Sequence, residues 1–271
     1  MPKSVLVGLD GTPHSRAAAD LAFRWAAGFG TAVSGLGVVD EPGVCAPAMA
    51  PIGGGAFKEH RDEVLLARAH ERVDEWIEEF RRRAGDLPAR AYKVVGDPRD
   101  RLVAEAQRFD LLVLGRETHF KFATQADPCD TLRQVLRDSP RPVVAVPESP
   151  TAGRSTIVAY DGSLQAARAA YAFQASGLAI AGPVHIVGVG NDPSAAGRAV
   201  EFFAGHGVVA TPHLIPPAAS PAAVLQGAAG RLDAGLIVMG AYGQSVLREF
   251  FLGSVTRTLL REAAVPLFLF H

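Results

Sequence analysis

The sequence predicts an α/β protein made of two tandem, open, parallel five-stranded sheets with helices on both faces. The chain has 271 residues, which corresponds to roughly two domains of about 150 residues each. An internal repeat divides it into two similar halves. The candidate strands are short, continuous apolar runs rather than alternating ones, which is typical of parallel strands that are buried on both faces.

The repeat consists of four matches that occur in the same order in both halves. The matched pairs are Ser4–Thr12 with Ser155–Ser163, Val33–Val39 with Val184–Val189, Asp110–Gly115 with Asp233–Gly240, and Leu132–Val146 with Thr256–Phe270. Each half begins with an apolar run that ends at Asp-Gly-(Ser/Thr), and an Ala-rich helical stretch follows. Four collinear matches indicate an internal duplication. We therefore expect a first domain over residues 1–148, a linker at Glu148–Arg154 that contains a proline and a glycine, and a second domain over residues 154–271.

Several element boundaries follow from local chemistry. Asp97-Pro98 and Ser220-Pro221 each place a side-chain acceptor at a helix N-cap and a proline at the first helical position. Apolar residues recur at helical spacing over Phe57–Arg83, which predicts a long helix with a charged, solvated face. The Gly- and Pro-rich segment Pro42–Gly55 predicts a loop.

Composition excludes several classes of protein. Apolar residues make up 48% of the chain, charged residues 20%, and the formal net charge is −1. A chain with this many apolar residues can form a packed core, and the near-neutral charge argues against a dedicated nucleic-acid surface. No apolar run reaches the roughly 20 residues that span a bilayer, and no signal peptide is visible. Neither cysteine lies in a metal-binding pair, and no catalytic motif or metal site is evident. We expect a cytoplasmic protein with no membrane or nucleic-acid partner.

The most informative segment runs from Gly240 through Gly243 to Gly253-Ser254 and lies between an apolar strand and a helix. Glycines at a strand end allow a ligand to approach the backbone, because no Cβ intrudes. A glycine and a serine at a helix start offer free N–H groups, a hydroxyl and the positive end of the helix dipole, which suit a phosphate. The alternative interpretation is that these glycines serve only turns and the helix start.

The spacing G-x-x-G, nine residues, G-(S/T), together with Asp-Gly-Ser after a first strand, resembles the universal stress protein family. The resemblance covers nearly the whole chain, once per half. It implies strand order 3-2-1-4-5 in each sheet, with the ends of the first and fourth strands beside the crevice where open α/β sheets bind ligands. It also implies that the fifth strands, Val143–Val146 and Leu267–Phe270, pair with each other and form a pseudo-dimer within one chain. A further homodimer and a protein partner stay open.

The resemblance to ATP-binding members also implies a set of ligand contacts. Asp161 and the backbone at Val189 would contact the adenosine, and Gly240, Gly243, Gly253 and Ser254 would hold the ribose and phosphates. The implied ligand is ATP, with or without Mg²⁺. The first half departs from this pattern: Thr118 stands where Gly243 does, and Cys129 and Asp130 stand where Gly253 and Ser254 do. Because an aspartate at this position would repel a phosphate, we expect no ATP bound there in the usual way.

Three functions are consistent with these residues. The leading hypothesis is a regulatory stress-response protein that binds ATP in its second half. The alternatives are a slow ATPase or related adenine-nucleotide hydrolase, and an interaction scaffold without nucleotide. The sequence shows no evident base that could orient a water molecule, so we expect at most slow hydrolysis. His14, which follows the first Asp-Gly-Thr turn, is predicted to be an exposed residue at a helix start.

Overall fold

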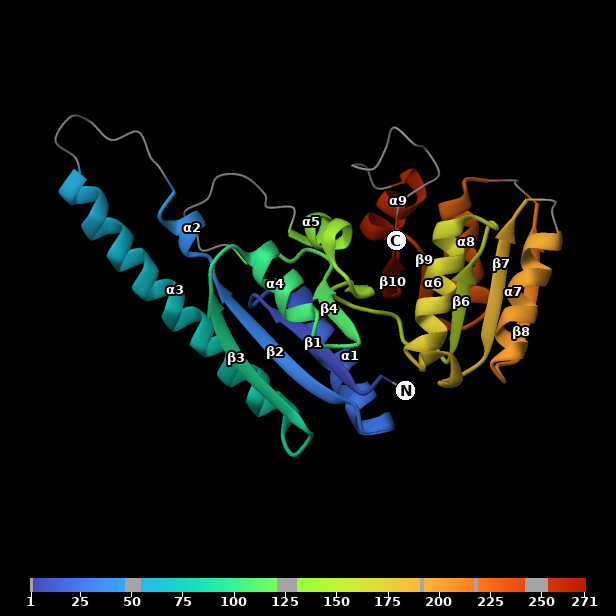
Figure 1. The fold of residues 1–271 in the computed structure, drawn as a ribbon, viewed down its shortest axis with the longest axis horizontal. Coiled ribbons are helices and arrows are strands. Elements are labelled where there is room, and N and C mark those ends of the chain that lie inside the picture. The colour runs from blue at the N-terminus through green and yellow to red at the C-terminus, as the bar shows by residue number, and fades with distance from the viewer. Residues whose placement is uncertain (1, 47–54, 121–130, 191–192, 217–218, 242–252) are drawn as a thin grey trace.

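The computed structural model describes residues 2–46, 55–120, 131–190, 193–216, 219–241 and 253–271. Its centre is one ten-stranded sheet with the order β3-β2-β1-β4-β5-β10-β9-β6-β7-β8. Figure 1 shows this sheet running through the length of the molecule, with the two halves of the chain at its two ends. The strands are β1 Ser4–Leu9, β2 Ala32–Val39, β3 Ala89–Val95, β4 Leu111–Gly115, β5 Val143–Val146, β6 Ser155–Ala159, β7 Val184–Val189, β8 Ala210–Ile215, β9 Ala234–Gly240 and β10 Leu267–Phe270.

Each half contributes five parallel strands in the predicted order 3-2-1-4-5, but the two sheets are not separate. They join edge to edge through β5 and β10, which pair antiparallel with Val144 opposite Phe268. This confirms the predicted pairing of the two fifth strands. Both strands are short apolar segments that would otherwise be bare sheet edges, so their pairing covers two association-prone edges at once.

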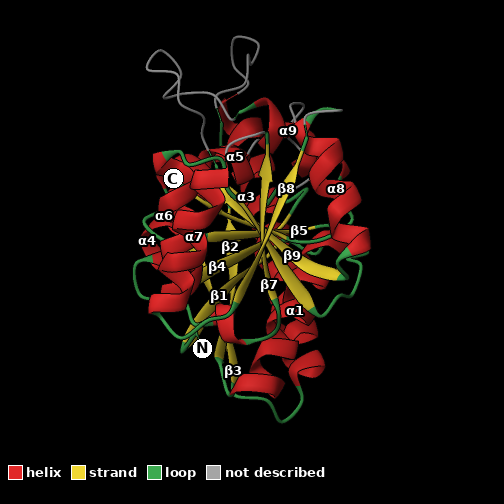
Figure 2. Ribbon diagram, turned by 90° about the vertical axis from the view of Figure 1, so that its right-hand side faces the viewer, coloured by secondary structure: helices red, strands yellow, loops and turns green. Residues whose placement is uncertain are grey.

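The helices cover both faces of this twisted sheet, whose strands fan around the line of sight in Figure 2. Residues of α1, α3, α6 and α7 belong to the apolar core on one face, and residues of α4, α5, α8 and α9 belong to the core on the other. The helical segments are α1 Pro13–Phe29, α2 Glu41–Val44, α3 Gly55–Ala84, α4 Pro98–Ala106, α5 Thr131–Asp138, α6 Leu164–Ala175, the 3₁₀ turn η1 Leu178–Ile180, α7 Pro193–Gly205, α8 Pro221–Arg231 and α9 Ser254–Glu262.

Helix starts follow the predicted side-chain caps. Asp97 accepts a hydrogen bond from the Asp100 N–H at the start of α4, and Ser220 accepts one from the Ala223 N–H at the start of α8. The predicted loop over Pro42–Gly55 is only partly correct. The short helix α2 occupies its beginning because the Asp40 side chain accepts a hydrogen bond from the Gly43 N–H at 2.9 Å.

The long helix α3 extends beyond the sheet edge at its amino-terminal end (Figure 1). Its carboxy-terminal part packs on the sheet through Val73, Ile77 and Phe80, which are buried. None of the described helices is both long and apolar enough to cross a membrane.

Candidate functional site

The turn after β6 presents a carboxylate at the carboxyl end of the sheet. Asp161 Oδ1 accepts a hydrogen bond from the Ser163 N–H at 2.9 Å, and the Ser163 hydroxyl in turn caps α6 by accepting from the Ala166 N–H. Gly162 adopts a φ of +79°, a conformation that L side chains rarely adopt. The turn leaves Asp161 exposed, with its second carboxylate oxygen receiving no hydrogen bond from a described residue.

Gly240 ends β9 and lies against the start of α6. A Cβ at this position would lie 2.7 Å from the Gln165 Cβ and 2.9 Å from the Gln165 backbone carbon, so only glycine fits. Gly115, its counterpart in the first half, is equally close to His14 on α1. Close packing between strand and helix is therefore a sufficient reason for a glycine at both positions, as the alternative interpretation of the sequence allowed.

Helix α9 begins without a side-chain cap. Its N-cap is Gly253, which has no side chain, whereas α1, α4, α6 and α8 each have a Thr, Asp or Ser side chain that accepts a backbone hydrogen bond. The first N–H groups of a helix have no partner within the helix and carry a partial positive charge. Among the helices of this half whose N-caps are described, α6, α8 and α9, the start of α9 is therefore the one best suited to bind an anion.

These elements enclose a cavity of about 470 Å³, a size within the usual range for small-molecule sites. Five of the six residues predicted from the sequence line it: Asp161, Val189, Gly240, Gly253 and Ser254. The sixth, Gly243, lies outside the described residues. Lining residues that the sequence analysis did not single out include Tyr160, Ser163, Gln165, Pro221, Leu225 and Thr256. Of these, Ser163 and Pro221 could have been assigned to the site from the sequence, since each stands at a predicted helix start.

Asp161 is the one charged side chain among the described residues of the lining. No lysine or arginine is among these described residues, so the groups there that can meet negative charge are backbone N–H groups and hydroxyls, chiefly at the start of α9. The apolar side is formed by Val187, Val189, Leu225 and Met239. The cavity therefore combines an apolar wall, a carboxylate that accepts hydrogen bonds and a helix end that attracts anions.

The corresponding place in the first half is filled by the chain itself. Asp10 is buried, with one carboxylate oxygen accepting from the Thr12 N–H and hydroxyl, and the other accepting from the His119 N–H at 2.8 Å. These bonds hold the segment that follows β4, and Phe120 is fully buried there. Its Cζ would lie 3.0 Å from a Cβ placed on Gly8, and Leu102 is close to the same point.

The counterparts of Gly8 and Leu102 in the second half are Ala159 and Leu225, and both line the open cavity. In the second half, none of the described residues fills the space that Phe120 fills in the first. Thr118, which replaces a motif glycine, is buried and donates its hydroxyl hydrogen bond to the Gly115 carbonyl. Cys129 and Asp130 lie outside the described residues.

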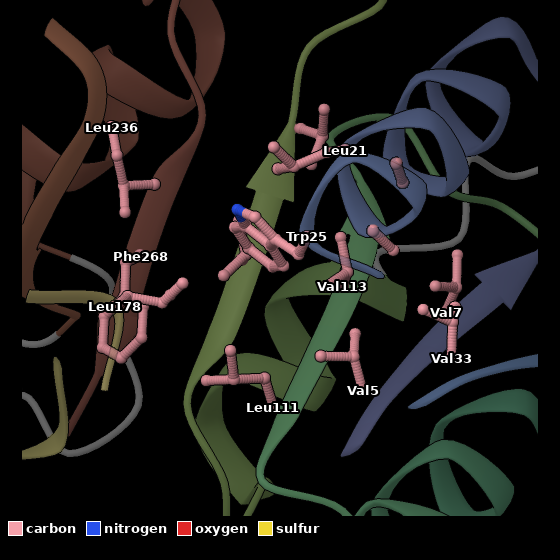
Figure 3. Packing of buried hydrophobic residues seen from close by; sticks show 14 of the residues in the cluster. Val5, Val7, Leu21, Trp25, Val33, Leu111, Val113, Leu178, Leu236 and Phe268 are labelled. Atoms are coloured by element: carbon pink, nitrogen blue, oxygen red, sulfur yellow. The ribbon is translucent and has the colours of Figure 1, made fainter. Parts of the chain in front are cut away.

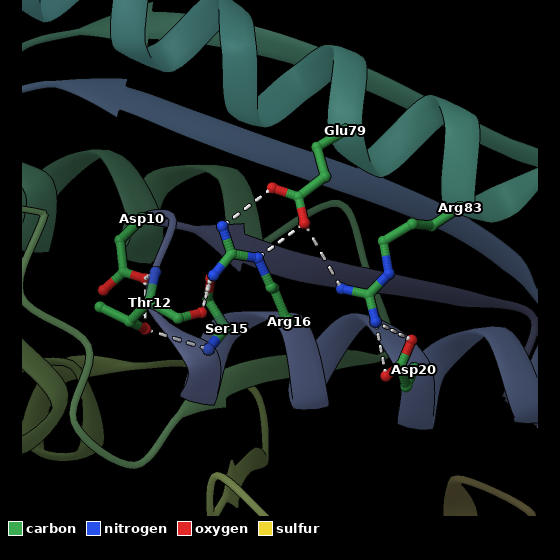
Figure 4. Close-up of polar contacts among 7 residues, drawn as sticks. All are labelled: Asp10, Thr12, Ser15, Arg16, Asp20, Glu79 and Arg83. Carbon is green, nitrogen blue, oxygen red and sulfur yellow. Dashed lines mark hydrogen bonds and ion pairs between the residues drawn. The ribbon is translucent and has the colours of Figure 1, made fainter.

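Helix α3 packs against the turn that follows β1 in the first half. Trp76 lies so close to Gly11 that its Nε1 would be 2.1 Å from a Cβ placed there. Beside it, Arg16 donates hydrogen bonds to both carboxylate oxygens of Glu79, as Figure 4 shows. The Arg16 hydrogen bond lowers the pKa of Glu79, which keeps this carboxylate ionised. The prediction that His14 is exposed is wrong: it is buried against Gly115, with Nε2 3.5 Å from a Glu117 oxygen.

Comparison with known proteins agrees with this architecture. A model of the universal stress protein family matches residues 1–147 and 209–271. The chain belongs to the universal stress protein family. The match includes Gly240, Gly253 and Ser254, whereas Asp161 and Val189 lie in the unmatched stretch between its two segments.

Individual members of the family are distant from this one. The universal stress protein Slr1230 of a Synechocystis species is 28% identical over 169 residues, which span 60% of this chain and 58% of that protein. The crystal structure of a universal stress protein from Archaeoglobus fulgidus superposes with a TM-score of 0.68 at 19% identity, covering 98% of this chain and 95% of that one. A Pseudomonas aeruginosa protein described as a putative member reaches 0.57 at 16% identity, covering 99% and 93%. These structures show that the tandem fold is shared.

Proposed function

We propose that this universal stress protein binds ATP, with or without Mg²⁺, in the cavity of its second half and thereby regulates a protein partner. The observation that carries the proposal is the uncapped start of α9, which opens into a cavity with Asp161 in its lining. In this proposal Gly253 and Ser254 hold the phosphates, and Gly243 completes the glycine motif. Asp161 accepts hydrogen bonds from the ribose hydroxyls, and Val189 lies at the adenine end. Since ATP is abundant in the cytoplasm, the proposal places the protein there.

The first half serves as a structural partner without nucleotide. Phe120 occupies the space that corresponds to the open cavity, and both oxygens of Asp10 already accept hydrogen bonds. A stoichiometry of one ATP per chain follows. The proposal also retains the two predicted domains, residues 1–148 and 154–271, and places the one nucleotide site in the second.

Binding without rapid turnover fits the lining better than hydrolysis does. Asp161 is the one carboxylate among the described lining residues, and the proposal already engages it with the sugar. A general base must lie within hydrogen-bond reach of the attacking water, and no second candidate of this kind is present in the described lining.

The first prediction uses Gly253→Asp. An aspartate is a favourable N-cap, so its side chain would accept the N–H groups of α9 and would keep the helix folded while excluding phosphate. We expect isothermal titration calorimetry to show one ATP per wild-type chain and at least tenfold weaker binding by the variant. Gly230→Asp is the matched control, because it adds the same charge near the end of α8, where a Cβ meets nothing within 4 Å.

Each other result has a definite meaning. No ATP binding by the wild type, or equal binding by Gly253→Asp, contradicts the proposed site. Two ATP molecules per chain contradict the assignment of the first half. Repeated release of phosphate in the same samples would establish the hydrolase alternative in its place.

A further inference from the structure

A second cavity, of about 380 Å³, lies where the two halves of the chain meet. It is lined by the carboxy-terminal part of α1, the linker between the halves, η1 and the amino-terminal ends of β6 and β9. The proposed nucleotide site lies at the carboxyl ends of the same strands, so the two cavities are at opposite ends of the second half-sheet.

The walls of this junction cavity are apolar on two sides. Leu21, Trp25 and Phe29 come from α1, and Leu178 and Leu236 come from the second half. Figure 3 shows Leu21 and Trp25 on one side and Leu178 and Leu236 on the other, with a strand of the sheet between them. Water gains few hydrogen bonds on such walls, so the cavity favours an occupant with an apolar body.

The charged side chains among the described lining residues are both positive. They are Arg24 and Arg154, and no acidic residue is found among them. Arg154 is neutralised by Asp233, with an Nε–Oδ2 distance of 2.7 Å. Arg24 is exposed and forms no ion pair with any residue that the structure describes. One uncompensated positive charge therefore stands at the cavity.

A second donor lines the same cavity. The Trp25 ring is largely buried, but its indole N–H reaches solvent, and no described residue accepts a hydrogen bond from it. In Figure 3 the indole nitrogen lies on the side of the ring nearer to Leu236. The indole N–H and the Arg24 guanidinium are thus two donors on one cavity, which suit an acceptor that carries negative charge.

We propose that the junction cavity binds a small amphipathic carboxylate, with the carboxylate near Arg24 and the Trp25 N–H and the hydrocarbon body between Leu178 and Leu236. A medium-chain fatty acid has this chemistry: one anionic end that pairs with a guanidinium and an apolar body that fits a cavity of this size. The site is independent of the proposed ATP site, since the two cavities have no described lining residue in common and lie at opposite ends of the strands.

The test is an NMR titration of the whole protein with decanoate, with decanol as the uncharged probe. The chain has two tryptophans, Trp25 and Trp76, so a ¹H–¹⁵N spectrum shows two indole signals, which Trp76→Phe assigns. We expect decanoate to shift the Trp25 signal in a saturable way and to leave the Trp76 signal in place, because Trp76 lies on α3 against Gly11. Decanol should bind at least tenfold more weakly.

Two variants locate the contacts. Arg24→Gln removes an exposed charge and should weaken decanoate binding about tenfold, whereas Arg24→Lys should retain most of it. Ala181→Phe places a ring at the exposed rim of the cavity and should block both probes. No saturable shift of the Trp25 signal overturns the site. Equal binding of decanoate and decanol, or unchanged binding by Arg24→Gln, overturns the anionic class of ligand.

Discussion

Phe120 fills the crevice of the first half. The residue is fully buried and adopts a φ of +49°, which is unusual for a side chain larger than glycine. The backbone conformation costs roughly 1–2 kcal/mol. Burial of the ring and the hydrogen bond from the His119 N–H to Asp10 offset this cost. A loop that would otherwise leave the first half open is thereby fixed over it.

We expect Phe120→Ala to lower the free energy of unfolding by about 3–5 kcal/mol, since it removes a fully buried ring. Phe120→Gly should be less harmful than Phe120→Ala by about 1 kcal/mol, because glycine tolerates the positive φ. Urea unfolding of both variants measures these changes in the free energy of unfolding. A glycine variant that is clearly the less stable of the two would show that the strained conformation is not retained in solution.

The sequence indicates some of these residues and not others, for a physical reason. Asp161, Gly253 and Ser254 lie directly after a strand or at a helix start, so their positions in an open sheet follow from the order of the elements. The burial of Phe120 and His14 depends on how the chain folds back after Gly115. This reversal is a tertiary effect that hydrophobic periodicity does not encode. The same applies to Gln165, whose place in the cavity results from close packing against Gly240.

Helix α9 is held differently at its two ends. Its start lacks a side-chain cap and faces the proposed ATP site, whereas its end is bound by the other half of the chain. Arg116, which directly follows β4, donates a hydrogen bond from Nη1 to the carbonyl of Ala263, the C-cap of α9, at 2.7 Å. A cation at the carboxyl end of a helix also complements the helix dipole. The first half therefore positions the helix on which the second half's site is built.

We expect Arg116→Met to lower the free energy of unfolding by about 1–2 kcal/mol, because the hydrogen bond involves a charged donor. Hydrogen exchange at the amides of α9 should speed up more than exchange in β6 or β7. Arg72→Met, on the exposed face of α3, is the control and should change stability by less than about 0.5 kcal/mol. Uniform acceleration throughout the protein would contradict a specific role in holding α9.

Elements with a local signal could be predicted, and elements without one could not. The starts of α4 and α8 follow from Asp97-Pro98 and Ser220-Pro221, and the long helix α3 follows from its apolar periodicity. The short helix α2 has too few residues to show any period, and its start depends on the single side chain of Asp40. The sequence therefore predicts a loop at this position.

The ten-stranded sheet joins the two halves into one packed body. Each of the two apolar cores contains residues from both halves, and Phe268 of β10 is fully buried opposite Val144 of β5. The sequence repeat predicts two sheets, and the resemblance to the family implies that their fifth strands pair. The domain boundary at Glu148–Arg154 stays a prediction.

We expect the two halves to unfold together. Trp76 lies against Gly11 in the first half, so its fluorescence in a Trp25→Phe background reports on that half, whereas Phe268 lies in the second. Phe268→Ala should cost about 3–5 kcal/mol and should shift the fluorescence and circular dichroism transitions by the same amount. Val209→Ala, at a side chain that is 88% exposed, should shift neither. An unchanged fluorescence midpoint in Phe268→Ala would mean that the halves unfold separately.

The antiparallel junction of β5 and β10 lies within a single polypeptide, and this has an evolutionary consequence. Between two separate identical subunits, such an interface would weaken on dilution, and each substitution would be present twice because of the symmetry. Within one chain the tether keeps the local concentration of one partner high at any dilution. In this chain a substitution is present once, so one half can lose its ligand crevice while the other half keeps its own.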